Sequence, residues 1–93
     1  MAITSFRCRD TARLFGGRRV ARFANIEAVA MRKLAMLARV VDVAELRIPP
    51  SNRLEALKAD RIGQCSIRVN DQWRLCFRFD AGNAFDVEIV DYH

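Results

Sequence analysis

Residues 64–90 read QCSIRVNDQWRLCFRFDAGNAFDVEIV, and their hydrophobic pattern is the strongest indication of the fold. Apolar and polar residues alternate along 64–69, 73–79 and 85–90. Alternation with a period of two is typical of strands that have one face on a core. The letters NDQ and DAGN between these segments are turn formers. We therefore expect three consecutive antiparallel strands joined by tight turns.

Matching the apolar faces of these strands predicts their register. A three-residue loop places Val69 opposite Trp73, whereas a two-residue loop would set apolar residues opposite polar ones. Arg68 then lies directly opposite Arg74, and like charges at facing positions destabilise a sheet. Such a pair is retained where water screens it, where an acid such as Glu88 neutralises it, or where an anion binds. In the next hairpin the predicted pairs are Phe79 with Phe85, Phe77 with Val87 and Arg78 with Asp86.

The N-terminal part of the chain predicts one strand and a short helix. Residues 2–8 are rich in strand formers. A helix through Phe15 follows, capped by Asp10 or Thr11 and ended by the glycine pair after it.

A longer helix is expected over 26–40, with Asn25 as its cap. Its apolar positions recur at helical spacing: Ile26, Val29, Ala30, Leu34, Leu37 and Val41. One more turn over 42–46 precedes a Pro-Pro pair that breaks regular structure. The order β-α-α-β-β-β predicts a single α+β domain, residues 1–93, with an antiparallel sheet and two N-terminal helices packed on one face.

The charge balance gives the first indication of a ligand. The chain of 93 residues is 52% hydrophobic and 29% charged, which is a globular composition, and its net charge is +5. Of its 16 cations, 14 are arginine, whose planar fork of donors fits phosphate bidentately. A nucleic acid is one polyanion that fits this charge. An acidic partner protein fits the same numbers, and so does ordinary surface charge.

The cysteines and the hydropathy pattern indicate a cytoplasmic protein. Cys8, Cys65 and Cys76 are an odd number without metal-ligand spacing, so we expect reduced thiols and no metal site. No stretch has the length of a membrane span, and the first residues do not form a secretory signal. We therefore expect no membrane partner.

Two blocks of this sequence carry a family resemblance. LEALKADRIGQCSIRVNDQWRLCFRF, residues 54–79, and the final FDVEIVDYH resemble the HigB toxins of the RelE/ParE superfamily of type II toxin–antitoxin systems. The resemblance extends over essentially the whole chain and implies a RelE-like fold. It also implies a metal-independent endoribonuclease without cofactors, an mRNA interferase that cleaves mRNA in the ribosomal A site and inhibits translation. The implied partners are a HigA-like helix-turn-helix antitoxin, the ribosome with its rRNA and mRNA, and operator DNA only through the antitoxin.

The resemblance assigns catalytic roles to five residues. In this family a ribose 2′-hydroxyl attacks the adjacent phosphate, which requires a base, an acid and cations for the added negative charge. Arg74, in QWRLCF, stands where the superfamily keeps a phosphate-binding arginine. Arg68, in SIRV, and Lys58, in LEALKAD, match further basic positions. Tyr92 and His93 match a terminal Tyr-His pair and are assigned jointly to proton transfer.

The same resemblance implies supporting roles for two acidic residues and shows two positions at which this sequence differs from the family. Asp91 precedes the terminal pair as in the family and is expected to orient a neighbour. Glu55 occupies a position where a histidine is frequent, and Ala59 replaces a common glycine. Lys58, Glu55, Tyr92 and His93 all remain candidates for the general base.

A further set of arginines is expected to bind RNA or the ribosome. The connector 17–22 is expected to be mobile and to bind rRNA or antitoxin. The proposed RNA-binding residues are Arg18, Arg19, Arg22, Arg61 and Arg78.

Two other functions remain open at this stage. One is a ParE-like toxin that inhibits a topoisomerase without cutting RNA, although ParE chains generally lack this basic cluster and the Tyr-His pair. The other is a binding module that acts as an antitoxin-bound transcriptional co-repressor. No helix-turn-helix pattern is found in this sequence, so operator recognition would come from the partner.

Overall fold

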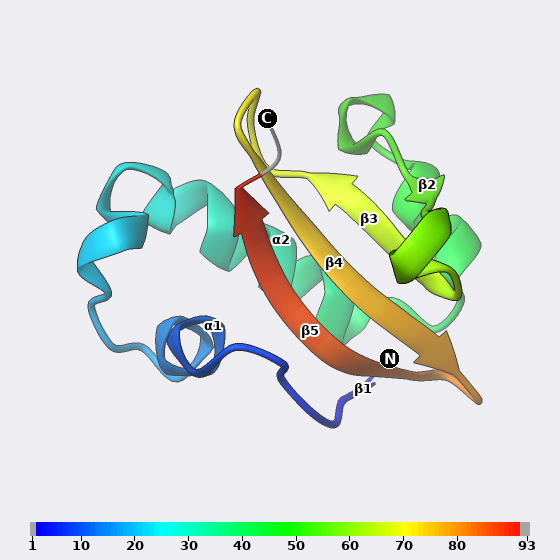
Figure 1. The fold of residues 1–93 in the computed structure, drawn as a ribbon, viewed down its shortest axis with the longest axis horizontal. Coiled ribbons are helices and arrows are strands. Elements are labelled where there is room, and N and C mark those ends of the chain that lie inside the picture. The colour runs from blue at the N-terminus through cyan, green and yellow to red at the C-terminus, as the bar shows by residue number, and fades with distance from the viewer. Residues whose placement is uncertain (1, 92–93) are drawn as a thin grey trace.

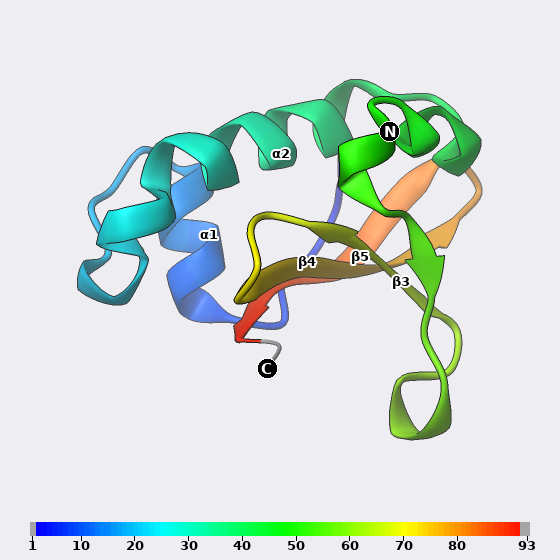
Figure 2. The same cartoon turned by 90° about the horizontal axis from the view of Figure 1, so that it is seen from above.

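A mixed sheet of five strands, with helices on one face, forms the protein (Figures 1 and 2). The computed structural model describes residues 2–91. The strands lie in the order β1-β5-β4-β3-β2. The helices and strands are β1 (Ala2–Ile3), α1 (Arg9–Phe15), α2 (Glu27–Arg39), β2 (Glu55–Ala56), β3 (Gln64–Arg68), β4 (Trp73–Asp80) and β5 (Asn83–Asp91). The predicted α+β class, with two N-terminal helices on one face, is confirmed.

Both edges of the sheet differ from the prediction, because one edge strand is parallel to its neighbour and the other was not expected. β1 is only two residues long and pairs with β5 in parallel. The chain after it still follows β5, because Thr4 N donates to Ala84 O at 2.8 Å and Arg7 N donates to Val87 O at 3.1 Å. At the other edge β2, which the sequence pattern did not indicate, pairs with β3 antiparallel.

The register of the first hairpin is confirmed. Ile67 pairs with Leu75 and Arg68 with Arg74. The loop between β3 and β4 is closed by the Asn70 side chain, whose Oδ1 accepts from the backbone N–H groups of Gln72 and Trp73 at 2.8 Å each. The two arginines therefore face each other across neighbouring strands.

The predicted register of the second hairpin is wrong near the turn between β4 and β5. Phe79 pairs with Ala84 and Arg78 with Phe85, one residue away from the predicted partners, whereas Leu75 pairs with Ile89 as the predicted register requires. Ala81 and Gly82 both have positive φ, which makes a two-residue hairpin turn possible.

A bulge in β5 takes up the extra residue that this shorter turn leaves over. The strand register shifts between Cys76 and Arg78, and Asp86, which lies on β5 within the shift, has φ +53°. The bulge lets Ala84 and Val87 both reach the core, while Phe85 is only half-buried.

The core lies between the helices and the inner face of the sheet. Phe23 is fully buried and meets Trp73 edge-on, with ring centroids 5.5 Å apart. The buried residues of α2 are Ala30, Leu34 and Leu37. Val41 was predicted to join this face but is 76% exposed, because α2 ends at Arg39.

The predicted helix caps are wrong. Neither Asp10 nor Thr11 caps α1, whose N-cap is Cys8; the Thr11 hydroxyl instead accepts from Ile89 N at 3.0 Å and ties α1 to β5. A 3₁₀ helix over Ala21–Ile26 runs directly into α2, which leaves Asn25 inside helical structure.

A 3₁₀ turn over Val43–Arg47 forms where one more turn was expected after α2. It begins with a capping box. Asp42 Oδ1 accepts from Ala44 N at 3.0 Å, and Glu45 Oε2 accepts from Asp42 N at 2.7 Å.

Candidate functional site

Arg74 is fixed on the outer face of the sheet, opposite the helices. Its Nε donates to Ser66 Oγ at 2.8 Å, and its Nη2 donates to Arg53 O at 2.7 Å. The Glu55 carboxylate lies 3.7 Å from the same Nη2. Glu55 on β2 pairs with Ser66 on β3, so the Glu55 carboxylate and the Ser66 hydroxyl both lie beside the Arg74 guanidinium.

Arg74 is less accessible than its position on an outer face suggested. Only 12% of its side chain is exposed, and Ser66 is fully buried. Alternation along β4 predicts that Arg74 lies on the face turned away from the core and is exposed to solvent, and this prediction of an exposed side chain is wrong. The guanidinium is pre-oriented by two neutral acceptors, the Ser66 hydroxyl and the Arg53 carbonyl, which is the arrangement that a phosphate-binding arginine needs.

The facing pair Arg68 and Arg74 is relieved by two separate acids. Arg68 forms a salt bridge with Asp71, three residues along the hairpin loop, and Arg74 has Glu55. Glu88, suggested as the neutralising acid from sequence, is bound elsewhere. Asp71 and Glu55 are 100% and 52% exposed at their side chains, so a bound anion could displace them at small cost.

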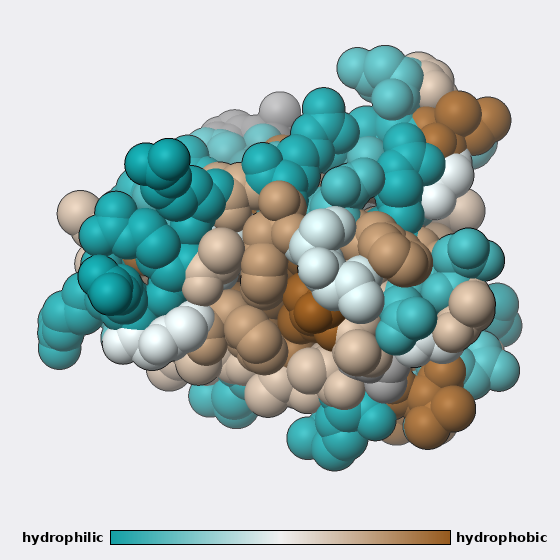
Figure 3. Space-filling model, turned by 90° about the horizontal axis from the view of Figure 1, so that it is seen from below, coloured by the Kyte–Doolittle hydropathy of each residue, from teal (hydrophilic) through white to brown (hydrophobic). Residues whose placement is uncertain are grey.

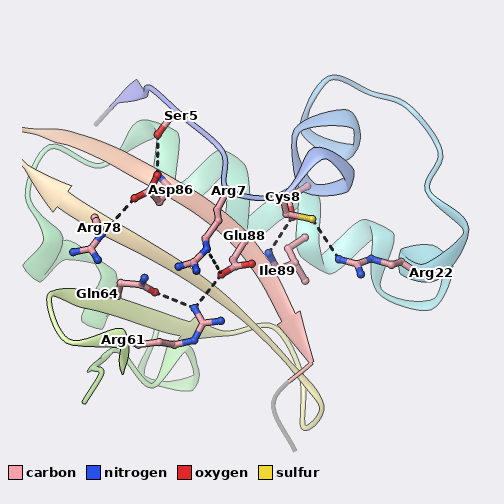
Figure 4. A network of polar contacts seen from close by, with 11 residues as sticks. Ser5, Arg7, Cys8, Arg22, Arg61, Gln64, Arg78, Asp86, Glu88 and Ile89 are labelled. Carbon is pink, nitrogen blue, oxygen red and sulfur yellow. Dashed lines mark hydrogen bonds and ion pairs between the residues drawn. The ribbon is translucent and has the colours of Figure 1, made fainter. Parts of the chain in front are cut away.

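Glu88 is the centre of a second polar network on this face (Figure 4). Arg61 Nη1 lies 3.0 Å from Glu88 Oε1 and 3.1 Å from Gln64 Oε1, and Arg7 Nε lies 3.8 Å from the same carboxylate oxygen. The hydrogen bond to Glu88 raises the pKa of the Arg61 guanidinium. The Arg61 guanidinium is therefore bound within the fold to Gln64 and Glu88.

Cys76 lies on the same face, paired with Glu88 in the register, and is completely buried. Burial raises the pKa of its thiol to about 11. Burial likewise raises the pKa of Cys65. Cys76 is therefore a neutral packing residue near pH 7 and has no character of a nucleophile.

Lys58 lies on the loop between β2 and β3. Its side chain is exposed, and within residues 2–91 its ammonium forms no hydrogen bond or ion pair. A 3₁₀ turn over Ala59–Arg61 follows it. Ala59 has φ +57°, in the left-handed region that favours glycine, so a glycine at this position would be free of strain.

The basic segment after α1 is partly held in place. Arg22 belongs to the 3₁₀ helix Ala21–Ile26, its Nε lies 3.3 Å from Asp10, and its guanidinium lies 4.7 Å from the Phe23 ring centroid. Arg18 and Arg19 are exposed. Hydrophilic residues gather at this end of the molecule, where α1 and residues 16–26 lie, as Figure 3 shows on the left.

The remaining candidates lie at opposite ends of the strands. Arg78 is half-exposed and pairs with Asp86 at 3.3 Å. Asp91, at the end of β5, accepts from Gln72 Nε2 at 3.0 Å. Tyr92 and His93 lie outside the described residues. The structure thus brings Arg68, Arg74 and Glu55 together, whereas Ser66 and the Arg53 carbonyl are partners that the sequence reasoning missed.

Residues 2–91 contain neither a cluster suited to a metal ion nor a helix suited to span a membrane. No group of three or more His, Cys, Asp or Glu side chains is arranged to bind a metal ion. No helix there has the length and apolar character needed to cross a membrane.

Similarity to known proteins identifies the family. The family described as RelE-like toxin of type II toxin–antitoxin system HigB matches residues 6–93. The chain belongs to this HigB-like toxin family. Its fold and the predicted resemblance agree with this assignment.

Curated relatives carry corresponding names. Toxin HigB-1 of Vibrio cholerae is 45% identical over 62 residues, which is 67% of this chain and 65% of that protein. Endoribonuclease HigB of Proteus vulgaris is 44% identical over 41 residues, 44% of this chain and 45% of that protein. An uncharacterized protein of Haemophilus influenzae is 39% identical over 56 residues, 60% of this chain and 55% of that protein. The matched part of the chain thus spans less than two thirds of each of these relatives.

Proposed function

We propose that this HigB-like toxin is an endoribonuclease that cleaves mRNA on the ribosome. The observation that carries the proposal is the Arg74 guanidinium, fixed by Ser66 and the Arg53 carbonyl, with Arg68 on the facing strand. Two arginines at facing positions, each beside an exposed carboxylate of the described residues, match the need of a phosphodiester that gains negative charge as it is attacked. The name of the Proteus vulgaris relative, Endoribonuclease HigB, points to the same chemistry.

The proposed reaction is an attack by the ribose 2′-hydroxyl on the adjacent phosphate. A base takes the hydroxyl proton, the new O–P bond forms, and the bond to the 5′-oxygen breaks as an acid protonates that oxygen. Arg74 and Arg68 stabilise the charge on the non-bridging oxygens. Tyr92 and His93, matched to the Tyr-His pair of the family, are the proposed proton carriers, and Lys58 is a third cation.

The proposed cellular setting follows from the family. The toxin acts in the cytoplasm, in the ribosomal A site, and needs no metal ion for the transfer steps above. A HigA-like antitoxin is the proposed partner that neutralises it, and operator DNA is reached only through that antitoxin. Arg18, Arg19, Arg22, Arg61 and Arg78 are proposed to contact rRNA or mRNA.

Primer extension on a reporter mRNA tests this function. After brief induction of the wild-type chain, new 5′ ends should appear within the translated region, and they should disappear when the reporter lacks a ribosome-binding site. Growth arrest without new 5′ ends, together with loss of gyrase supercoiling activity in a purified assay, would instead support a ParE-like topoisomerase inhibitor.

A further inference from the structure

A groove of about 500 Å³ lies between α2 and the end of β3. One wall is formed by α2, and the opposite wall includes Arg68, Val69 and the segment around Ser51. Its polar lining is strongly cationic, with Arg32, Lys33 and Arg39 from the helix in addition to Arg68. No carboxylate is among the described residues that line it.

Within residues 2–91, no acidic side chain pairs with the helix cations of the groove. In the described part of the chain, neither Arg32 nor Arg39 forms a salt bridge, and the Lys33 ammonium donates to the amide oxygen of buried Asn52, which is neutral. Burial lowers the pKa of Lys33, and repulsion from Arg32 and Arg68 lowers it further. A cluster of cations that repel one another is stabilised when an anion binds among them.

We propose that this groove binds backbone phosphates of single-stranded RNA, next to the phosphate held by Arg74. The inference rests on the proposed function and extends its binding surface from the sheet to α2. Arg32 and Arg39 are seven residues apart, so they lie two helical turns apart on the same side of α2. A single strand of RNA that lies along the groove would place different phosphates beside Arg32 and Arg39.

Continuity with Arg74 favours RNA over an acidic peptide. Arg68 lines the groove and also faces Arg74 across the sheet, so one arginine links the two surfaces. An RNA strand carries a negative charge on every nucleotide, so a strand bound at Arg74 requires cations at its neighbouring phosphates. An acidic segment of a protein partner has no such requirement for continuity with Arg74.

The test is the salt dependence of binding to a labelled single-stranded RNA oligonucleotide, measured by fluorescence anisotropy without ribosomes. The groove variant carries Arg32→Gln and Arg39→Gln, both at exposed helix positions. The matched control carries Arg9→Gln and Arg47→Gln, which remove the same charge from exposed positions outside the groove. Each phosphate contact with a single strand contributes about 0.7 to the slope of log K against log salt, so the groove variant should lose about 1.4 of slope. The control should lose less than half of that.

Each outcome decides the proposal. A groove variant that keeps the slope of the control, or a wild-type protein that does not bind the oligonucleotide, overturns it. If the groove variant weakens binding of a poly-glutamate peptide while its RNA binding stays at the control level, the groove serves an acidic protein segment and the proposal is also overturned. Failure of the proposed function is separate, because it would appear as normal oligonucleotide binding by the wild type without cleavage of translated mRNA.

Discussion

Glu55 limits how tightly Arg74 can hold a phosphate, and Glu55→Gln tests this. The carboxylate lies 3.7 Å from Arg74 Nη2 and would lie close to any phosphate bound there. Glutamine preserves the size of the side chain and the backbone pairing of Glu55 with Ser66. The substitution therefore removes one negative charge and little else.

The magnitude follows from Coulomb's law and exposure. Two unit charges 3.7 Å apart interact by about 1 kcal/mol at the dielectric constant of water. The Glu55 side chain is 52% exposed, and exposed pairs contribute only about 0.2–1 kcal/mol. Loss of a comparable repulsion should strengthen RNA binding by a factor of about 1.4 to 5. The free energy of unfolding should fall by no more than about 1 kcal/mol.

Two assays measure this prediction. Affinity is measured on an RNA whose 2′-hydroxyl at the cleavage position is replaced by hydrogen, and the cleavage rate is measured in a single turnover on ribosome-bound mRNA. Asp80→Asn, an exposed acid at the far end of β4, is the matched control and should leave both values near wild type. Glu55→Gln should bind more tightly and cleave within about threefold of the wild-type rate. A rate loss of roughly 100-fold or more would identify Glu55 as the general base and contradict a purely electrostatic effect of its carboxylate.

Three further predictions concern stability. Ser66→Ala removes the fully buried hydroxyl that accepts from Arg74 Nε, so urea denaturation should show about 1–3 kcal/mol less free energy of unfolding, and an unchanged midpoint would contradict this. Ala59→Gly removes the left-handed strain of φ +57° and should raise the free energy of unfolding by about 1 kcal/mol; a lower melting temperature would count against it. Folding raises the pKa of Cys76 from 9.0 to about 11, so the thiol loses its proton at lower pH in the unfolded chain than in the folded one. The free energy of unfolding should therefore be unaffected by this thiol below pH 9 and should fall by on the order of 2 kcal/mol as the pH rises to 11. Cys76→Ala should lack this part of the loss, and identical pH profiles for the two proteins would show that the thiol is not responsible.

The sequence predicted the features that depend on side-chain periodicity. Alternation along β3 and β4 is strong, so the strands, the loop between them and the facing pair Arg68 and Arg74 were all predictable. The bulge at Asp86 was not, because it compensates for a turn whose backbone angles at Ala81 and Gly82 leave no trace in the hydrophobic pattern.

The surroundings of Arg74 depend on contacts that periodicity does not report. β2 has two residues, too few for an alternating pattern, yet it brings Glu55 to the guanidinium. Ser66 was within reach of prediction, since the correct register places it on the face of Arg74 and one diagonal step away. The groove on α2 combines residues from a helix and a strand that only the tertiary fold brings together.

The single-turnover rate of mRNA cleavage on stalled ribosomes by Arg74→Lys tests directly whether the Arg74 guanidinium stabilises the attacked phosphate. Lysine keeps the charge and loses the planar fork of donors. With folding verified by urea denaturation and Arg47→Lys as an exposed control, we expect a rate roughly 30- to 1000-fold below wild type for Arg74→Lys alone. Cleavage at the wild-type rate by folded Arg74→Lys protein would contradict this role of Arg74.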